Sequence, residues 1–163
     1  MAQMTRRTVL RGLGVAGAAA AASGSFALGL PACAVAQVLG QQESVQEGLK
    51  RVFGGRPMKD GSGLLKLDLP FIAENGAVVP VGVELGVAPT ATDYVKNIYI
   101  VADKNRIPFV TRVTLAPEAG RAFMGANIRL GETGDLRAIA EQSDGTLLMV
   151  KREVKVTVGG CGG

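Results

Sequence analysis

Seven short segments in which apolar and polar residues alternate constrain the fold of this chain more than any other feature of its sequence. An alternation of period two is typical of a β-strand with one buried face. Turn residues separate the segments at intervals of roughly 8 to 14 residues, and no helical period follows Gly55. The pattern therefore favours an antiparallel β-sandwich over alternating strand–helix units. The predicted strands span 65–69, 79–85, 94–101, 109–115, 122–130, 136–141 and 146–158.

One helix is predicted before these strands. Within residues 45–53, apolar side chains recur at the first, fifth, eighth and ninth positions, which places them on one helical face. Ser44 precedes the segment and Glu47 follows three residues later, the arrangement of a capping box. Two glycines, Gly54 and Gly55, end the segment.

Side chains inside and between these elements receive structural roles. The seven aromatic residues, together with Met124 and Met149, are expected in the core. Asn75, Asp103 and Asp144 fall in predicted turns. Their side chains are expected to bond to the turn backbone, although carboxylates at such places also suit a cation.

Residues 1–36 have the composition of an export signal. Arg6 and Arg7 precede an uncharged stretch from residue 12 to residue 30 that is rich in alanine and glycine, the pattern of a twin-arginine signal peptide. The A-x-A sequence of 34–36 predicts cleavage before Gln37 and a periplasmic location. Two alternatives remain open: a retained membrane anchor, and acylation of Cys33 in a lipoprotein box.

Charge and composition exclude several classes of function. Removal of 36 of the 163 residues leaves 127, with 15 basic and 14 acidic side chains, so most of the net charge of +4 belongs to the leader. No remaining segment combines clustered basic residues with aromatics, which argues against nucleic-acid binding. The chain has no histidine, which removes histidine-dependent nucleophile pairs, zinc motifs and haem attachment. No cofactor motif or metal site is predicted.

The C-terminal five residues are the strongest candidate for a functional site. Gly159, Gly160, Gly162 and Gly163 surround Cys161, the one thiol that follows the leader. Glycines predict a thin and flexible tail, and three residues beyond the last strand give the thiol a reach of roughly 10 Å. No lysine or arginine is closer in sequence than Lys155, so nothing local lowers the pKa of the thiol. We therefore expect a covalent carrier on which partner enzymes act.

Two other functions fit the same tail. In the first, the chain is an interaction subunit whose tail cysteine forms a structural disulfide with another chain. In the second, it is a thiol peroxidase, although it lacks a resolving cysteine and a group that would activate the thiol. In each case the sequence divides into a leader (1–36), a β-sandwich domain (37–158) and a tail (159–163).

The sequence resembles the SoxY family, the carrier subunits of the thiosulfate-oxidising Sox system. The resemblance rests on the terminal GGCGG of 159–163 and on the EVKVTV strand before it. It extends to IAENG at 72–76 with VPV at 79–81, and to NIRL at 127–130 with SDG at 143–145.

This resemblance implies an immunoglobulin-like sandwich that forms a heterodimer with a second small β-protein, SoxZ. It implies that the c-type haem enzyme SoxAX conjugates Cys161 to thiosulfate and that the metal-dependent hydrolase SoxB removes the sulfonate. A sulfane dehydrogenase, where present, would oxidise the remaining sulfur. The resemblance implies no cofactor, no nucleic acid and no stable membrane association for the carrier itself.

Overall fold

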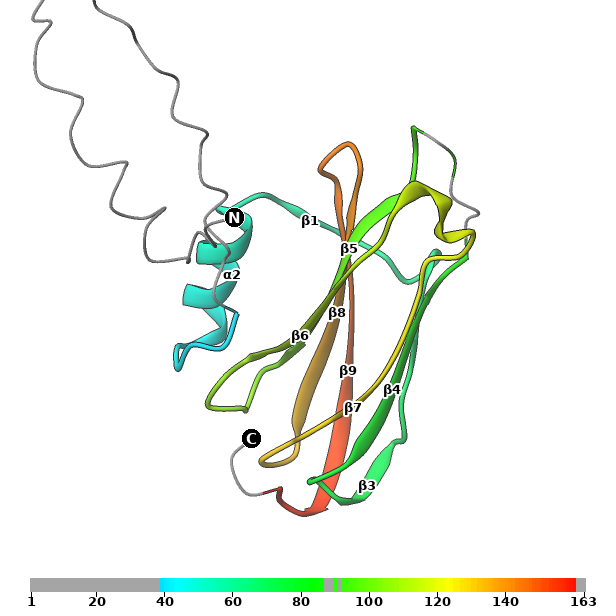
Figure 1. The fold of residues 1–163 in the computed structure, drawn as a ribbon. Coiled ribbons are helices and arrows are strands. Elements are labelled where there is room, and N and C mark those ends of the chain that lie inside the picture. The colour runs from blue at the N-terminus through cyan, green and yellow to red at the C-terminus, as the bar shows by residue number, and fades with distance from the viewer. Residues whose placement is uncertain (1–38, 87–89, 91, 161–163) are drawn as a thin grey trace, which may run out of the picture. The chain divides into compact units, whose positions relative to one another are not determined.

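A computed structural model describes residues 39–86, 90 and 92–160, which form a β-sandwich with one helix (Figure 1). One short 3-10 turn, η1 (Pro117–Ala119), precedes β7. The helix is α2 (Val45–Phe53), and the strands are β1 (Met58–Asp60), β2 (Leu65–Asp68), β3 (Ile72–Asn75), β4 (Val79–Leu85), β5 (Val95–Ala102), β6 (Phe109–Thr114), β7 (Phe123–Ile128), β8 (Gly134–Gln142) and β9 (Leu147–Val158).

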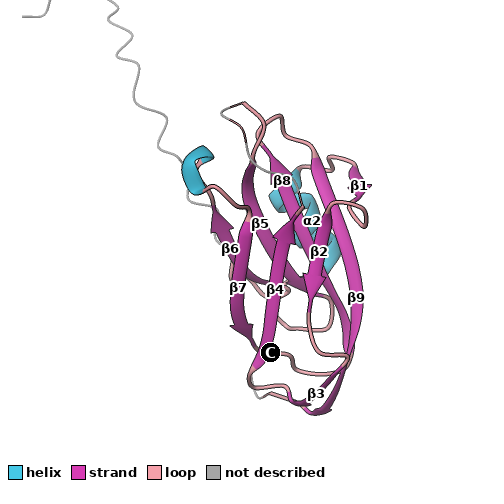
Figure 2. Ribbon diagram, turned by 90° about the vertical axis from the view of Figure 1, so that its right-hand side faces the viewer, coloured by secondary structure: helices cyan, strands magenta, loops and turns pink. Residues whose placement is uncertain are grey.

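The two sheets confirm the predicted antiparallel sandwich. The larger sheet has the order β1-β9-β8-β5-β6, with β3 also paired to β9, and the smaller one has the order β2-β4-β7. Figure 2 shows the smaller sheet in front and α2 behind the larger one. All seven predicted strands are present, and they pair antiparallel within the sheets.

Two strands were not predicted. β1 and β3 both run parallel to β9 and lie along the same edge of it. With three and four residues they are too short to show an alternation, so only pairing with β9 makes them strands. Glu74 and Asn75, predicted as part of a turn, instead end β3, and the turn begins at Gly76.

Helix α2 covers the outer face of the larger sheet. The Ser44 hydroxyl oxygen accepts a hydrogen bond from the Glu47 N–H, and the Glu47 carboxylate accepts one from the Ser44 N–H, so the predicted capping box is confirmed. The buried face of the helix packs on a cluster that includes Tyr99, Phe109 and Ile139. Apolar burial of this kind holds a helix that is too short to be stable alone.

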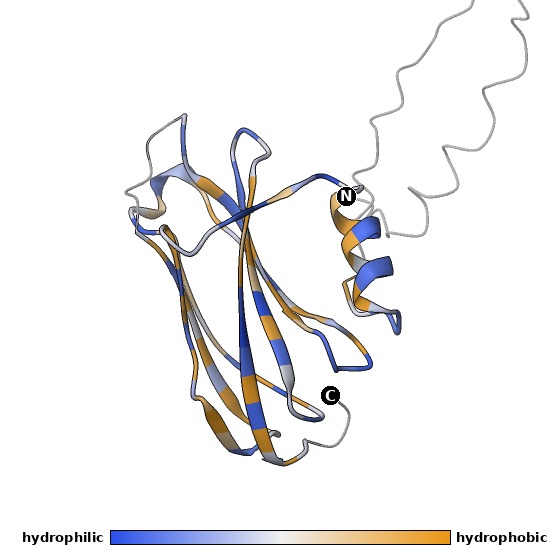
Figure 3. Cartoon of the chain, turned by 180° about the vertical axis from the view of Figure 1, so that it is seen from behind, coloured by the Kyte–Doolittle hydropathy of each residue, from blue (hydrophilic) through white to orange (hydrophobic). Residues whose placement is uncertain are grey.

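The helix explains why β5 is almost continuously buried. Ile98 and Ile100 face the core between the sheets, whereas Tyr99 and Val101 face α2. The larger sheet is therefore buried on both faces at this strand. Outside the patch that α2 covers, which also includes Phe109 and Ile139, one face meets solvent, and the alternation of apolar and polar residues is visible along the strands in Figure 3.

Phe26 lies outside the described residues, and for two of the other six aromatic residues the expected place in the core is wrong. Phe53, Tyr99 and Phe109 do form a buried cluster, with the rings of Phe53 and Tyr99 5.0 Å apart in an edge-on contact. In contrast, Phe71 is 62% exposed and Phe123 is 53% exposed. Phe71 precedes β3 at the end of the sandwich, and Phe123 opens β7 on the solvent side of the smaller sheet.

The leader lies outside the described residues, as do its predicted cleavage site and Cys33. The boundary between the leader and the sandwich therefore stays a prediction. Within the part of the chain that the structure covers, no helix has the length and apolar character needed to cross a bilayer.

Glu141, near the end of β8, connects this strand with β5 and with the segment that follows α2. Its carboxylate accepts hydrogen bonds from Arg56 (2.8 Å), from the Asn97 amide (2.8 Å) and from the Tyr99 hydroxyl (3.3 Å). Burial by itself would raise the pKa of Glu141, but the hydrogen bonds from Arg56 and Asn97 and the charge of Arg56 outweigh it and lower the pKa.

We expect Glu141→Gln to lower the free energy of unfolding by about 1–2 kcal/mol at pH 7, because a charged acceptor is lost from a half-buried network. A lowered folded-state pKa stabilises the protein above the unfolded pKa, and this contribution is lost as the pH falls through the folded value. Wild type and variant should therefore converge in urea unfolding only when the pH falls below the lowered folded-state pKa of Glu141. Glu118→Gln, at an exposed position, is the control. A difference in unfolding free energy between wild type and Glu141→Gln that does not depend on pH would contradict the role given to the Glu141 charge.

Candidate functional site

The last residues of β9 meet two distant segments in a junction of backbone hydrogen bonds. The Gly76 N–H donates to the Val158 carbonyl (2.7 Å), the Leu130 N–H donates to the Gly76 carbonyl (2.8 Å), and the Gly160 N–H donates to the Leu130 carbonyl (2.9 Å). We call Gly76, Leu130 and Gly160 the tail root. All three are buried, so the chain is fixed up to residue 160.

Glycine is required at this junction because the backbones approach closely. A Cβ on Gly76 or on Gly159 would overlap a carbonyl oxygen, of Leu130 and of Gly131 respectively. A Cβ on Gly160 would lie 2.6 Å from the Gly76 carbonyl oxygen. These neighbours are backbone atoms, which cannot rotate away as a side chain can.

The prediction of a flexible tail that begins at Gly159 is therefore corrected. The backbone of Gly159 is exposed but passes close to the Gly131 carbonyl, and Gly160 is buried and hydrogen-bonded. Their lack of a side chain serves close approach rather than freedom of the chain. Cys161, Gly162 and Gly163 lie outside the described residues, so their predicted roles as attachment site and flexible tail stay predictions.

Asn105 holds the loop that binds the tail. Its amide nitrogen donates to the Arg129 carbonyl (2.7 Å), and its amide oxygen accepts from the Gly131 N–H (3.1 Å). The side chain is 9% exposed and thus fixes the residues on either side of Leu130. No local pattern in the sequence predicts this role of Asn105, since its partners are 24 and 26 residues away.

The tail root unites three of the segments on which the family resemblance rests. The segment 72–76 supplies Gly76, the segment 127–130 supplies Leu130, and the final strand leads to Gly160. Residues that are scattered along the sequence thus meet around the start of the tail. The red end of β9 lies beside β3 in Figure 1.

The three turn residues that could suit a cation are engaged within the protein. Asp144 accepts from the Thr146 N–H (2.7 Å), which confirms its turn role, and Asn75, although it ends β3, accepts from the Ala77 N–H (2.8 Å) in the turn that follows. The hydrogen bonds from the Thr146 backbone and hydroxyl lower the pKa of Asp144. Asp103 differs, since its carboxylate binds Arg137 through both oxygens. Among the described residues, no three acidic, cysteine or histidine side chains are grouped to hold a metal ion.

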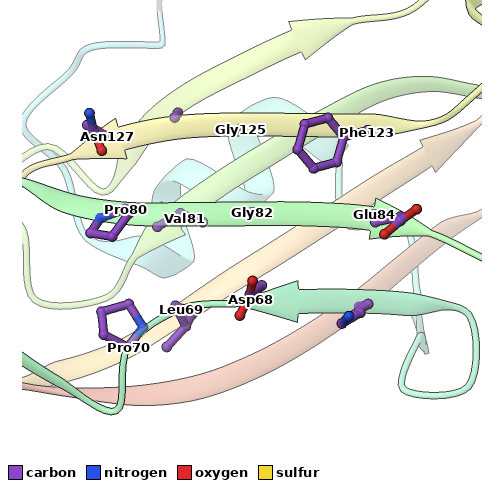
Figure 4. Close-up of a pocket in the computed structure, with 12 residues that line it drawn as sticks. Asp68, Leu69, Pro70, Pro80, Val81, Gly82, Glu84, Phe123, Gly125 and Asn127 are labelled. Atoms are coloured by element: carbon purple, nitrogen blue, oxygen red, sulfur yellow. The ribbon is translucent and has the colours of Figure 1, made fainter.

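A shallow groove of about 770 Å³ crosses the outer face of the smaller sheet (Figure 4). Gly82 and Gly125, which are paired across β4 and β7, form its floor, and Phe123 and Pro80 rise beside them. No cysteine, serine or threonine lines the groove, and of its two carboxylates, Asp68 and Glu84, the second is paired with Arg121. Its lining offers an open surface rather than a catalytic arrangement.

Comparisons with known proteins agree with this geometry. The model of the family described as "Sulfur oxidation protein SoxY" matches residues 49–161, which include the tail root and Cys161. A solved structure of the sulfur carrier protein SoxY from Chlorobium limicola f thiosulfatophilum is similar, with 29% identity and a TM-score of 0.58, over 71% of this chain and 97% of that one. No curated protein matches the chain.

Other solved structures share the fold alone. A superoxide reductase (neelaredoxin) from Ignicoccus hospitalis aligns with 20% identity and a TM-score of 0.52, over 60% of this chain and 86% of that one. A putative superoxide reductase from Thermotoga maritima aligns with 15% identity and a TM-score of 0.51, over 61% of this chain and 92% of that one. Because the family model spans most of the sandwich and reaches the tail cysteine, this chain belongs to the SoxY family of sulfur oxidation proteins.

Proposed function

We propose that this protein carries sulfur derived from thiosulfate as a covalent adduct on Cys161 and presents it to partner enzymes. The observation that carries the proposal is the tail root, which fixes Gly160 immediately before the one thiol outside the leader. The similar solved structure is named a sulfur carrier protein. A fixed point of exit followed by a single cysteine suits a group that other proteins must find and modify.

The tail root supplies position but no acid, base or activating charge. Its three hydrogen bonds join backbone groups only, and Asn105, the side chain that holds the segment around Leu130, is a neutral amide. A thiol without an activating partner keeps an ordinary reactivity. The groups that remove protons, electrons or sulfonate therefore belong to the partner enzymes.

Loading is an oxidation. The thiol of Cys161 loses its proton, and its sulfur forms a bond with the sulfane sulfur of thiosulfate, which gives Cys–S–S–SO₃⁻. Two electrons leave the reacting pair and are accepted by the c-type haem enzyme SoxAX. The carrier contributes one sulfur atom to the new bond.

Unloading of the sulfonate is a hydrolysis without redox change. Water attacks the terminal sulfur, the S–SO₃ bond breaks, and sulfate and two protons are released. The metal-dependent hydrolase SoxB carries this step, and the sulfane sulfur stays on the carrier as Cys–S–S⁻. A sulfane dehydrogenase acts on that product where one is present. Throughout the cycle the carrier is paired with a second β-protein, SoxZ.

Intact-protein mass spectrometry of carrier from thiosulfate-grown cells tests the assignment. We expect a gain of one S₂O₃ unit that maps to Cys161 and disappears with a reductant, and a smaller sulfane adduct after treatment with the hydrolase. A fixed disulfide to another chain, with no sulfur adduct in either state, would instead identify a structural subunit.

The proposed site of action is the periplasm, reached through the leader of 1–36. Lysine at positions 6 and 7 is expected to abolish export, because the twin-arginine pathway reads the arginine pair. Fractionation and immunoblotting should then find only the 163-residue precursor in the cytoplasm, whereas Arg11→Lys should leave a 127-residue periplasmic form that begins at Gln37. Export by the double variant would refute the signal, and a lipid on Cys33 would refute cleavage after Ala36.

A further inference from the structure

Exposed apolar side chains gather at the end of the sandwich from which the tail emerges. Six large apolar side chains in the described part of the chain are exposed, and four of them are at this end: Phe71 (62%), Ile72 (54%), Val78 (61%) and Val158 (61%). Exposure of several such residues at one place marks an interaction site more often than a lone exposed residue does.

Val78 and Val158 are the two members closest to the tail root. Val158 accepts the hydrogen bond from Gly76, and Val78 follows Gly76 by two residues. The backbone that leads to Val78 passes close to Gly160, since a Cβ on Gly160 would lie 2.8 Å from the Cα of Ala77. The two valines thus come from segments on either side of the tail root, Val158 from the end of β9 and Val78 from the turn that leads into β4.

The anchored tail brings any reacting enzyme close to these valines. Consecutive Cα atoms are about 3.8 Å apart, so Cys161 begins within that distance of a buried and hydrogen-bonded glycine. Reacting atoms must come within about 3–3.5 Å of the sulfur. An enzyme that acts on the sulfur therefore places its own surface within roughly 10 Å of the tail root, against the residues around it.

We propose that Val78 and Val158 form an apolar rim on which the enzymes that modify Cys161 dock. The proposal rests on the carrier function above and names the surface that those enzymes use. The occupant is an enzyme whose active-site entrance is apolar. This enzyme also contacts Phe71 and Ile72, next to the rim. A permanent subunit would not fit the same place, because covering the rim would block access to the residue that follows Gly160.

The test uses the carrier with threonine at both positions, Val78→Thr and Val158→Thr. Threonine keeps the shape and the strand preference of valine but removes the apolar character. The matched control is Leu64→Thr, a residue that is 44% exposed and lies before β2, away from the tail root. Loading of each variant by the haem enzyme is measured as kcat/KM, together with alkylation by iodoacetamide and binding to the partner subunit.

We expect the double variant to lose about tenfold in kcat/KM through a higher KM. Alkylation, partner binding and thermal unfolding should be unchanged, and the control should load as the wild type does. Equal loading by the double variant would overturn the rim, and so would a parallel loss of partner binding, which would assign the valines to the subunit interface. If the haem enzyme does not load the wild type either, the result refutes the carrier function and not the docking surface.

Discussion

Cys161→Ser is expected to abolish thiosulfate turnover in the reconstituted pathway while the protein remains folded. Serine keeps the size and the position of the side chain, but its oxygen cannot form the sulfur–sulfur bond that loading requires. Residues 37–163 contain no second thiol that could replace it. Activity should therefore fall to the background of the assay rather than by a moderate factor.

Three measurements separate chemistry from folding in this variant. Thermal unfolding and binding to the partner subunit should match the wild type, whereas mass spectrometry should find no sulfur adduct. Cys33→Ser is the matched control and should retain full activity, since the cleavage proposed after Ala36 would remove residue 33. Turnover that persists in Cys161→Ser would refute the carrier function.

Gly76→Ala has the second-largest expected effect, although residue 76 is far from Cys161 in sequence. A methyl group there would overlap the Leu130 carbonyl oxygen and lie 2.8 Å from the Gly160 nitrogen. The backbone must shift to admit it, which we expect to lower the free energy of unfolding by about 1–3 kcal/mol. The hydrogen bond from Gly160 to Leu130 should weaken first, because it closes the junction.

The readout specific to the tail root is hydrogen exchange at the Gly160 amide. In Gly76→Ala this exchange should become faster than can be explained by the loss of global stability, and enzymatic loading should slow. Gly63→Ala is the control, since a Cβ there meets no atom within 4 Å. Unchanged exchange at Gly160 in Gly76→Ala would show that the tail is not held in the way described.

Local sequence patterns were sufficient for the elements that form most of the fold. Alternation along residues 79–85 and 147–158 predicts strands because each side chain needs only its neighbours to define a face. The capping box at Ser44 and Glu47 is likewise complete within four residues, and the structure contains both of its hydrogen bonds. The family resemblance followed from short motifs that are continuous in the sequence.

Exposed aromatics show where such reasoning is insufficient. Phe71 and Phe123 have the same side chain as Phe53 and Phe109, yet only the latter two are buried. A phenylalanine side chain favours burial wherever it occurs in the sequence. Whether it is buried depends on which elements pack against the one that carries it. The sequence therefore could not distinguish a core phenylalanine from one on the surface.

The sequence by itself determined that this chain forms a β-sandwich with one capped helix and ends in a single cysteine among glycines. Only the tertiary structure decided what the first of those glycines do, since Gly76, Leu130 and Gly160 meet across more than eighty residues of chain. Local preferences describe a glycine as free, whereas hydrogen bonds between distant backbones make it an anchor. The same non-local contacts give Asn105 its role and join β1 and β3 to the edge of β9.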